Sequence, residues 1–216
     1  MRTISRKDYA SMFGWNVPAL RALGAEFENT RNLGSASSYA RLRVPDGRLF
    51  SFLDLNMAYA STDVVVSLAK MKNHVTAGVT LSMKNLFGVM PGVYYGWPKN
   101  VLHHCGIDNS IVDIAATVRP QLAIVDGVVG MEGDGPIMGT PRQSKLLVMG
   151  TNLTAVDATT ARLMGFEPRR LPFLRVASGR LGPIAERHIQ QRGESIAQCA
   201  QRFALEDHPH FKRFRG

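Results

Sequence analysis

Three short apolar runs along the chain predict the strands of a buried sheet. They are residues 63–68 (DVVVSL), 122–125 (LAIV) and 145–149 (KLLVM). Apolar runs of this length are typical of parallel strands that are covered on both faces. Apolar residues at helical spacing over about 76–87, 111–118 and 153–164 predict helices between and after these strands. The sequence therefore predicts an α/β fold with a mostly parallel sheet and flanking helices.

The amino-terminal part of the chain predicts smaller elements. Asn16 before Pro18 is typical of a helix start, and Gly24 is typical of its end. Residues 39–44 and 48–53 are separated by the turn sequence Pro-Asp-Gly, which predicts a small β-hairpin. We expect this hairpin to precede the main sheet.

Length and composition agree with one globular domain over residues 1–205. The chain has 216 residues, of which 45% are hydrophobic and 20% are charged. The end, residues 206–216, is expected to be a flexible basic tail. Two cysteines, Cys105 and Cys199, indicate no disulfide framework, so we expect a cytoplasmic protein. The sequence has no apolar run long enough for a signal peptide or a membrane helix.

The formal charge of +9 is unevenly distributed. Residues 169–216 contain ten Lys or Arg and only four Asp or Glu. Such a surface attracts polyanions, nucleic acid among them. However, these arginines are scattered, without interleaved aromatic residues or a binding motif. We therefore expect a solvated basic face and no nucleic-acid partner.

The first candidate site lies where residues 121–139 (QLAIVDGVVGMEGDGPIMG) leave the second predicted strand. Asp126 follows the apolar run directly, and glycines recur after it. Glycine lets the backbone approach a ligand closely, and open α/β sheets bind ligands at the carboxyl ends of their strands. The alternative is a mobile loop in which the glycines only satisfy turns.

Basic residues follow the first predicted strand at the same end of the sheet. The sequence AKMKNH places Lys70, Lys72 and His74 there, and the next predicted helix carries Lys84 and Asn85. Lysines near a helix start make a candidate anion site, because helix N-termini also attract negative charge. The alternative is that the lysines are merely solvated.

Two further groups allow a structural explanation beside a functional one. His103, His104 and Cys105 suggest a metal site, but adjacent side chains point in different directions, so we expect a hydrogen-bonded histidine or a phosphate contact and no metal. Asp157 follows Thr154 at the spacing of a capping box, which explains this acid as well as a site role does.

Four motifs carry a family resemblance. In order they are VVSLAKMKNH, TLSMKNLFG, RPQLAIVDGVVGMEGDGPIMG and AVDATTARLMG. Together they resemble the domain of unknown function 362 family over about residues 62–165. The resemblance implies an α/β fold, and it supplies a site but no substrate. The positions that match the family pattern are Lys70, Lys72, His74, Lys84, Asn85, Asp126, Glu132, Gly133, Gly135, Pro136 and Asp157.

The same resemblance raises questions of cofactor and completeness. Family members are often fused to a ferredoxin-like domain with iron–sulfur clusters, but two cysteines cannot supply the four thiolates of a cubane cluster. We therefore expect no cofactor in this chain and place any cluster on a fused or separate partner. Members usually carry another α/β segment before the part matched by residues 22–54, so the chain is expected to be N-terminally shortened. A shortened sheet would expose an apolar patch or strand edge and associate with itself or a partner.

Three functional hypotheses follow. In the first, the protein is an enzyme in which Lys84, His74 and Asp126 act on a small anionic substrate, with a redox variant that draws electrons from a separate ferredoxin. In the second, it is a non-catalytic module that binds an anionic ligand or another subunit. In the third, it is a metal-dependent isomerase or racemase. The substrate-binding residues expected in the first are Lys70, Lys72, Asn85, Glu132, Gly133, Gly135 and Asp157.

Overall fold

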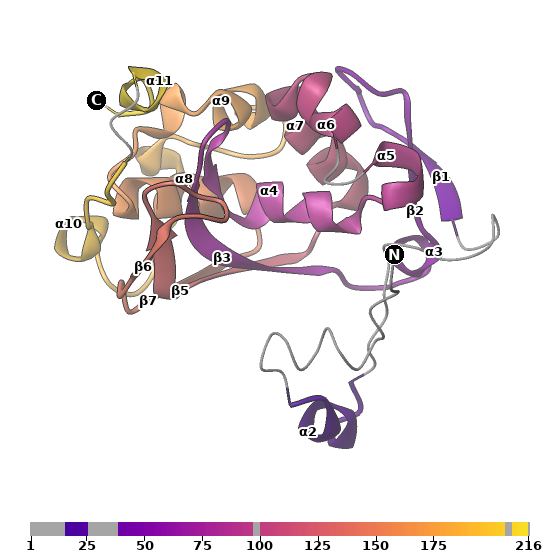
Figure 1. Cartoon of the computed structure of the whole chain (residues 1–216), viewed down its shortest axis with the longest axis horizontal. Coiled ribbons are helices and arrows are strands. Elements are labelled where there is room, and N and C mark those ends of the chain that lie inside the picture. The colour runs from indigo at the N-terminus through magenta and orange to yellow at the C-terminus, as the bar shows by residue number, and fades with distance from the viewer. Residues whose placement is uncertain (1–15, 26–38, 97–99, 206–208, 216) are drawn as a thin grey trace.

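The computed structural model describes residues 16–25, 39–96, 100–205 and 209–215. Within them a mixed sheet with strand order β4-β3-β5-β6 forms the centre of the fold, and β7 also pairs with β5 (Figure 1). Strands β3 and β5 are parallel, whereas the other pairs are antiparallel. The strands are β3 (Val66–His74), β4 (Gly78–Thr80), β5 (Leu122–Glu132), β6 (Thr140–Arg142) and β7 (Leu146–Gly150). The predicted α/β class is confirmed.

The two amino-terminal predictions are also confirmed. Helix α2 (Val17–Ala22) begins after Asn16, whose side chain accepts a hydrogen bond from the Ala19 amide at 3.1 Å. Strands β1 (Tyr39–Arg43) and β2 (Phe52–Asn56) form an antiparallel pair. The loop between them is fixed by the buried Asp113 carboxylate, which accepts hydrogen bonds from three consecutive amides, 48–50.

Helices cover one face of the sheet. Helices α4 (Ser82–Asn85) and α8 (Leu153–Leu163) contact the strands, and α7 (Ile107–Val118) and α9 (Pro172–Ala177) pack beside them (Figure 1). Because side chains alternate along a strand, every second residue of β3 and β5 points into this layer. Ala69, Met71, Ala123 and Val125 are accordingly at most 2% exposed. The hydrophobic core lies between the sheet and these helices.

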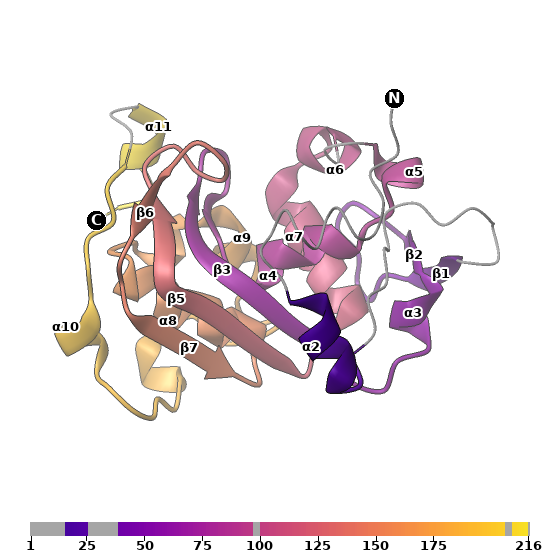
Figure 2. The same ribbon diagram turned by 60° about the horizontal axis from the view of Figure 1, so that its bottom comes forward.

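The opposite face of the sheet is exposed: Figure 2 shows α8 and α9 behind the strands and α4 and α7 beside β3. The strand register aligns Leu68, Ile124 and Met149 across β3, β5 and β7. Leu68 is 66% exposed and Met149 is 58% exposed. The prediction of strands buried on both faces is therefore wrong, since among the described residues a covering layer lies on one face only. We call the aligned residues Leu68, Ile124, Leu147 and Met149 the open apolar face.

The helix predicted over 76–87 is replaced by three short elements. The ring of His74 accepts hydrogen bonds from the Thr76 and Ala77 amides, which closes a turn after β3. Gly78, at a φ of 83°, then starts β4. Helix α4 and the 3-10 helix η2 (Leu86–Val89) follow. The predicted glycine loop also starts late, because β5 continues through Gly127 and Gly130 as far as Glu132.

The carboxyl-terminal region also differs from the sequence prediction. Residues 186–188 form the short 3-10 helix η4. Within the segment expected to be a flexible tail, Phe211 of α11 is 2% exposed and Phe214, which follows this helix, is fully buried. The remaining elements are α3 (Met57–Ala60), α5 (Gly92–Tyr95), α6 (Asn100–His104), η3 (Pro168–Arg170), η4 (Glu186–His188), α10 (Ile196–Cys199) and α11 (Pro209–Lys212).

Candidate functional site

Lys84 is a buried lysine for which the described part of the chain provides no acidic partner. It lies on α4 and is only 7% exposed. Its Nζ atom lies 3.5 Å from the centre of the Phe87 ring, which follows on η2. Among the described residues no salt bridge of Lys84 is found. Because burying an unpaired charge is costly, this arrangement favours either loss of the proton or binding of an anion.

Strand β3 brings Lys72 and His74 to the same place. The Lys72 ammonium donates a hydrogen bond to the Pro136 carbonyl oxygen at 3.4 Å. The Nδ1 atom of His74 accepts hydrogen bonds from the Thr76 and Ala77 amides at 3.2 and 3.3 Å. A backbone N–H can only donate, so Nδ1 carries no proton and the neutral ring holds its proton on Nε2. His74 therefore offers one N–H donor.

Helix α6 adds His103. Its ring is stacked on that of His74, with centroids 6.3 Å apart and planes 14° apart, and it meets the Phe87 ring edge to face at 5.3 Å. We call Lys72, His74, Lys84 and His103 the basic cluster. Its members come from β3, α4 and α6, and the aromatic ring of Phe87 is a common neighbour of Lys84 and His103.

Charges within the basic cluster act on one another. Burial, and then the charge of Lys72, lowers the pKa of Lys84 to about 7. Burial, followed by the charges of Lys84, His103 and Lys72, lowers the pKa of His74 to about 3. Burial also lowers the pKa of Lys72. His74 is thus neutral at physiological pH, whereas Lys84 exchanges its proton near neutrality, and no carboxylate opposes these shifts.

Asp157 fixes the helix that carries Lys84. This fully buried carboxylate on α8 accepts hydrogen bonds from the Ser82 amide, the Ser82 hydroxyl and the Met83 amide at 2.8, 2.6 and 3.0 Å. Burial raises its pKa to about 7, against the lowering effect of these hydrogen bonds. The predicted capping box is wrong, because Asn152 caps α8 through the Ala155 amide and Asp157 caps α4 instead.

Asn85 fixes the other end of the same short helix. Its side-chain amide donates to the Leu68 carbonyl at 3.1 Å and to the Ser67 hydroxyl at 3.3 Å. These contacts tie α4 to the backbone of β3. Asn85 and Asp157 therefore position Lys84, and their polar atoms are engaged in doing so.

The glycine loop reaches the end of β3 at Gly135 and Pro136. The Gly135 carbonyl accepts a hydrogen bond from the Val75 amide at 3.0 Å, and a side chain at this position would collide with the Asn73 backbone. Only glycine lets the loop lie this close to the end of β3. The Pro136 carbonyl then meets Lys72.

Glu132 and Gly133 serve the carboxyl-terminal segment instead. The Glu132 carboxylate accepts a hydrogen bond from the Ala204 amide at 2.8 Å and lies 3.5 Å from Arg142. The Gly133 amide donates to the Ala204 carbonyl at 3.0 Å. Neither residue contacts the basic cluster in these interactions.

Lys70 and Asp126 form a separate ion pair. Their Nζ and Oδ2 atoms are 2.5 Å apart, and they are register partners on neighbouring strands. They share the sheet face of the exposed Leu68 and Leu147, away from the helix layer that holds Lys84. The Lys70 hydrogen bond lowers the pKa of the Asp126 carboxyl. The expected single cleft is therefore divided, with Asp126 outside the basic cluster.

Sequence reasoning missed the role of Phe87, which it treated as one more core residue of a helix. The sequence did not indicate this role. The Phe87 ring lies under the Lys84 amine because α4 and η2 follow β4 in place of one continuous helix. Among the described residues no group of three or more His, Cys, Asp or Glu side chains could hold a metal ion. No helix in the described ranges is long and apolar enough to cross a membrane.

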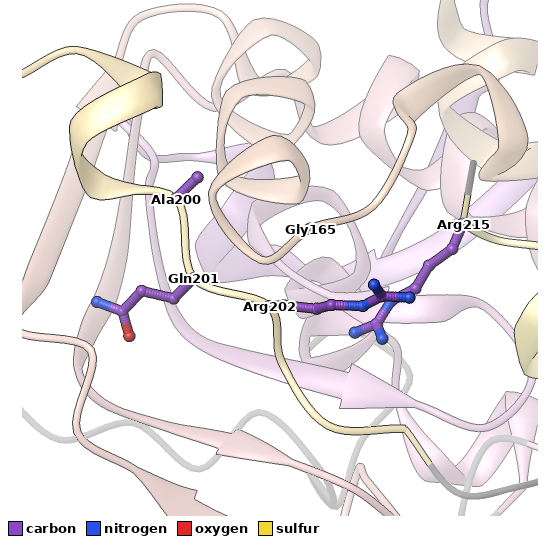
Figure 3. Close-up of a pocket in the computed structure, with 5 residues that line it drawn as sticks. All are labelled: Gly165, Ala200, Gln201, Arg202 and Arg215. Atoms are coloured by element: carbon purple, nitrogen blue, oxygen red, sulfur yellow. The ribbon is translucent and has the colours of Figure 1, made fainter.

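Two hollows occur elsewhere on the described surface. One, of about 320 Å³, is lined by Arg202 and Arg215 beside Gly165, with the two arginine side chains next to each other in Figure 3. The other, of about 500 Å³, lies around residues 178–188. Neither hollow is lined by a member of the basic cluster. The candidate site is therefore identified by its side chains and not by the volume of a cavity.

Replacing Lys84 with methionine is expected to stabilise the protein at neutral pH and to lose this effect at alkaline pH. The folded-state pKa of about 7 lies below the ordinary 10.5, so the penalty for burying the charge is complete below about pH 7 and vanishes above about pH 10.5. The gain in unfolding free energy at neutral pH is on the order of 4 kcal/mol. Urea denaturation at both pH values measures it.

The matched control is Lys145→Met, which removes an exposed lysine. Its effect on the unfolding free energy should be small at both pH values. An equal effect of Lys84→Met at neutral and alkaline pH would contradict the assignment of Lys84 as a buried, proton-exchanging amine.

Comparisons with known proteins agree with the motifs. A family model described as Domain of unknown function (DUF362) matches residues 7–162. The thylakoid-associated protein sll1697 of Synechocystis sp. is 32% identical over 142 residues, which are 63% of this chain and 43% of that protein. The chain thus aligns with less than half the length of this relative. No solved structure gives a significant match. Because the family model covers most of the sequence, the chain belongs to the domain of unknown function 362 family.

Proposed function

We propose that the basic cluster binds a small carboxylate or phosphate and that the protein acts on this anion as an enzyme. One observation carries the proposal. Lys72 and Lys84 lie together in a partly or fully buried setting, and no carboxylate among the described residues pairs with either. A bound anion would supply the missing negative charge and offset the cost of burial.

Each member of the cluster has a distinct part in this proposal. Lys72, which is half-buried, attracts the anion and holds one of its oxygens. The Nε2–H group of His74 donates a second hydrogen bond, because its Nδ1 atom is occupied by backbone amides. Lys84 gives or takes a proton, since its pKa of about 7 matches the working pH of a general acid–base group.

This assignment moves the proton-transfer role away from His74 and Asp126. His74 has a pKa of about 3 and is already neutral, so it makes a weak base and a better donor. Asp126 is engaged by Lys70 and by the Val128 amide. The non-catalytic binding module remains the second candidate. Once a substrate is in hand, loss of turnover with retained binding in Lys84→Ala favours catalysis, and equal loss of both favours a binding role.

Inorganic phosphate and oxalate are the probes for the anion site. Removal of a charge-assisted hydrogen bond should weaken binding about tenfold or more, so Lys72→Met and Lys84→Met should both do so. Affinity should also fall as the pH rises through about 7, because the anion favours the protonated Lys84. Isothermal titration calorimetry measures both effects.

The control is again Lys145→Met, which leaves the basic cluster intact. Unchanged affinity in both cluster variants, or no saturable binding of either probe, would refute the anion site. Binding that is lost in an Arg202→Met variant instead would move the site to the arginine-lined hollow of Figure 3.

We further propose that a second copy of the chain covers the open apolar face. Exposed aliphatic side chains aligned over three strands form the kind of surface that usually marks an interface.

Sedimentation velocity should show that the protein forms an assembly. The double variant Leu68→Gln, Met149→Gln should be a monomer in the same measurement. A monomer at all concentrations would contradict self-association, and a ferredoxin-like partner that binds this face would replace the second copy.

A further inference from the structure

Lys84 differs from an ordinary anion-binding lysine in what surrounds its amine. Lysines that only bind anions keep a hydrated ammonium, whereas Lys84 is almost fully buried and its Nζ atom lies over an aromatic ring. The charge that acts on it is that of Lys72, and the ring beneath its amine, Phe87, also contacts the His103 imidazole. No oxygen of a described residue accepts a hydrogen bond from it. An amine in such a setting is available as a nucleophile once its proton leaves.

The balance between amine and ammonium can be judged from magnitudes. The Phe87 ring, over which the Nζ atom lies, favours the ammonium. Burial and the charge of Lys72 nevertheless lower the pKa of Lys84 from 10.5 to about 7. The neutral amine is therefore populated at physiological pH, as nucleophilic lysines require.

We propose that Lys84 forms a Schiff base with the carbonyl group of a small 2-oxo acid. This inference rests on the proposed anion site and names its substrate class. A 2-oxo acid carries a carboxylate directly beside a carbonyl group. One lysine can therefore bind the carboxylate while a second lysine reacts with the carbonyl carbon. Lys72 holds the carboxylate, and Lys84 attacks the adjacent carbon.

The step balances without an oxidant or a reductant. The lone pair of the Lys84 Nζ atom forms a bond to the carbonyl carbon, and the C=O π pair moves to the oxygen, which takes up a proton. The nitrogen gives up one proton, which balances the proton taken up by the oxygen, and the carbinolamine forms. The hydroxyl then leaves together with the remaining N–H proton as water, and the nitrogen lone pair forms the C=N bond. The Nε2–H group of His74 is the donor available to the carbonyl oxygen during this addition.

The other lysines of the site region are less suited to the reaction. Lys70 is held by Asp126 in an exposed ion pair. Lys72 donates to the Pro136 carbonyl and lies nearer to solvent. Lys84 thus combines burial, a neighbouring cation and the absence of an oxygen partner.

Reductive trapping tests the inference directly. The full chain is incubated with pyruvate and sodium borohydride, and the adduct is located by peptide mass spectrometry. The expected result is one dominant adduct per chain, on Lys84, which inorganic phosphate suppresses by competition. Lys84→Arg should abolish it while retaining the positive charge, and Lys72→Met should slow it about tenfold or more because the carboxylate loses its anchor.

Two controls separate the outcomes. Lys145→Met should label at the rate of the unchanged protein, and thermal melting should show that Lys84→Arg is folded. Labelling spread over several surface lysines, or an unlabelled Lys84, would overturn the Schiff base. If phosphate still binds in that case, only the covalent step fails; if phosphate binding is absent too, the anion site itself fails.

Discussion

The candidate site depends on one buried carboxylate. Asp157 of α8 receives three hydrogen bonds from the first residues of α4. A helix of four residues is not stable alone, and its first amides need partners outside the helix. Hydrogen bonds to a charged group contribute about 1.5–3 kcal/mol each. Asp157 therefore determines where α4 lies, and with it the position of Lys84.

Two environments for lysine follow from this arrangement. On the open apolar face, Lys70 meets Asp126 in an ion pair that solvent reaches. In the basic cluster, the buried Lys84 lies over an aromatic ring and is influenced by the charge of the half-buried Lys72. The same side chain is a surface charge in one place and a proton-exchanging amine in the other. The difference arises from burial and from the presence or absence of a carboxylate, not from residue type.

The apolar pattern was sufficient to predict the α/β class, the hairpin and the approximate positions of β3, β5 and β7 along the chain. It could not show that Leu68 is exposed, because a run of apolar residues does not reveal whether a second layer covers the sheet. The turn closed by His74 and the cap that Asp157 supplies to another helix were also hidden, since both depend on tertiary contacts. Lys84 lies close enough to His74 for its charge to affect that ring. Asp126 instead pairs with Lys70, and the sequence of a strand does not specify which face of the sheet a side chain takes.

The pKa of Lys84 tests the account most directly. Lysine side chains of the isotopically labelled protein can be titrated by NMR through their Cε and Nζ resonances, with Lys84→Arg identifying the signal. The account predicts a midpoint at about 7 for Lys84. A midpoint near the ordinary value of 10.5 would show a solvated or ion-paired ammonium and would contradict the buried, unpaired amine on which the proposed chemistry depends.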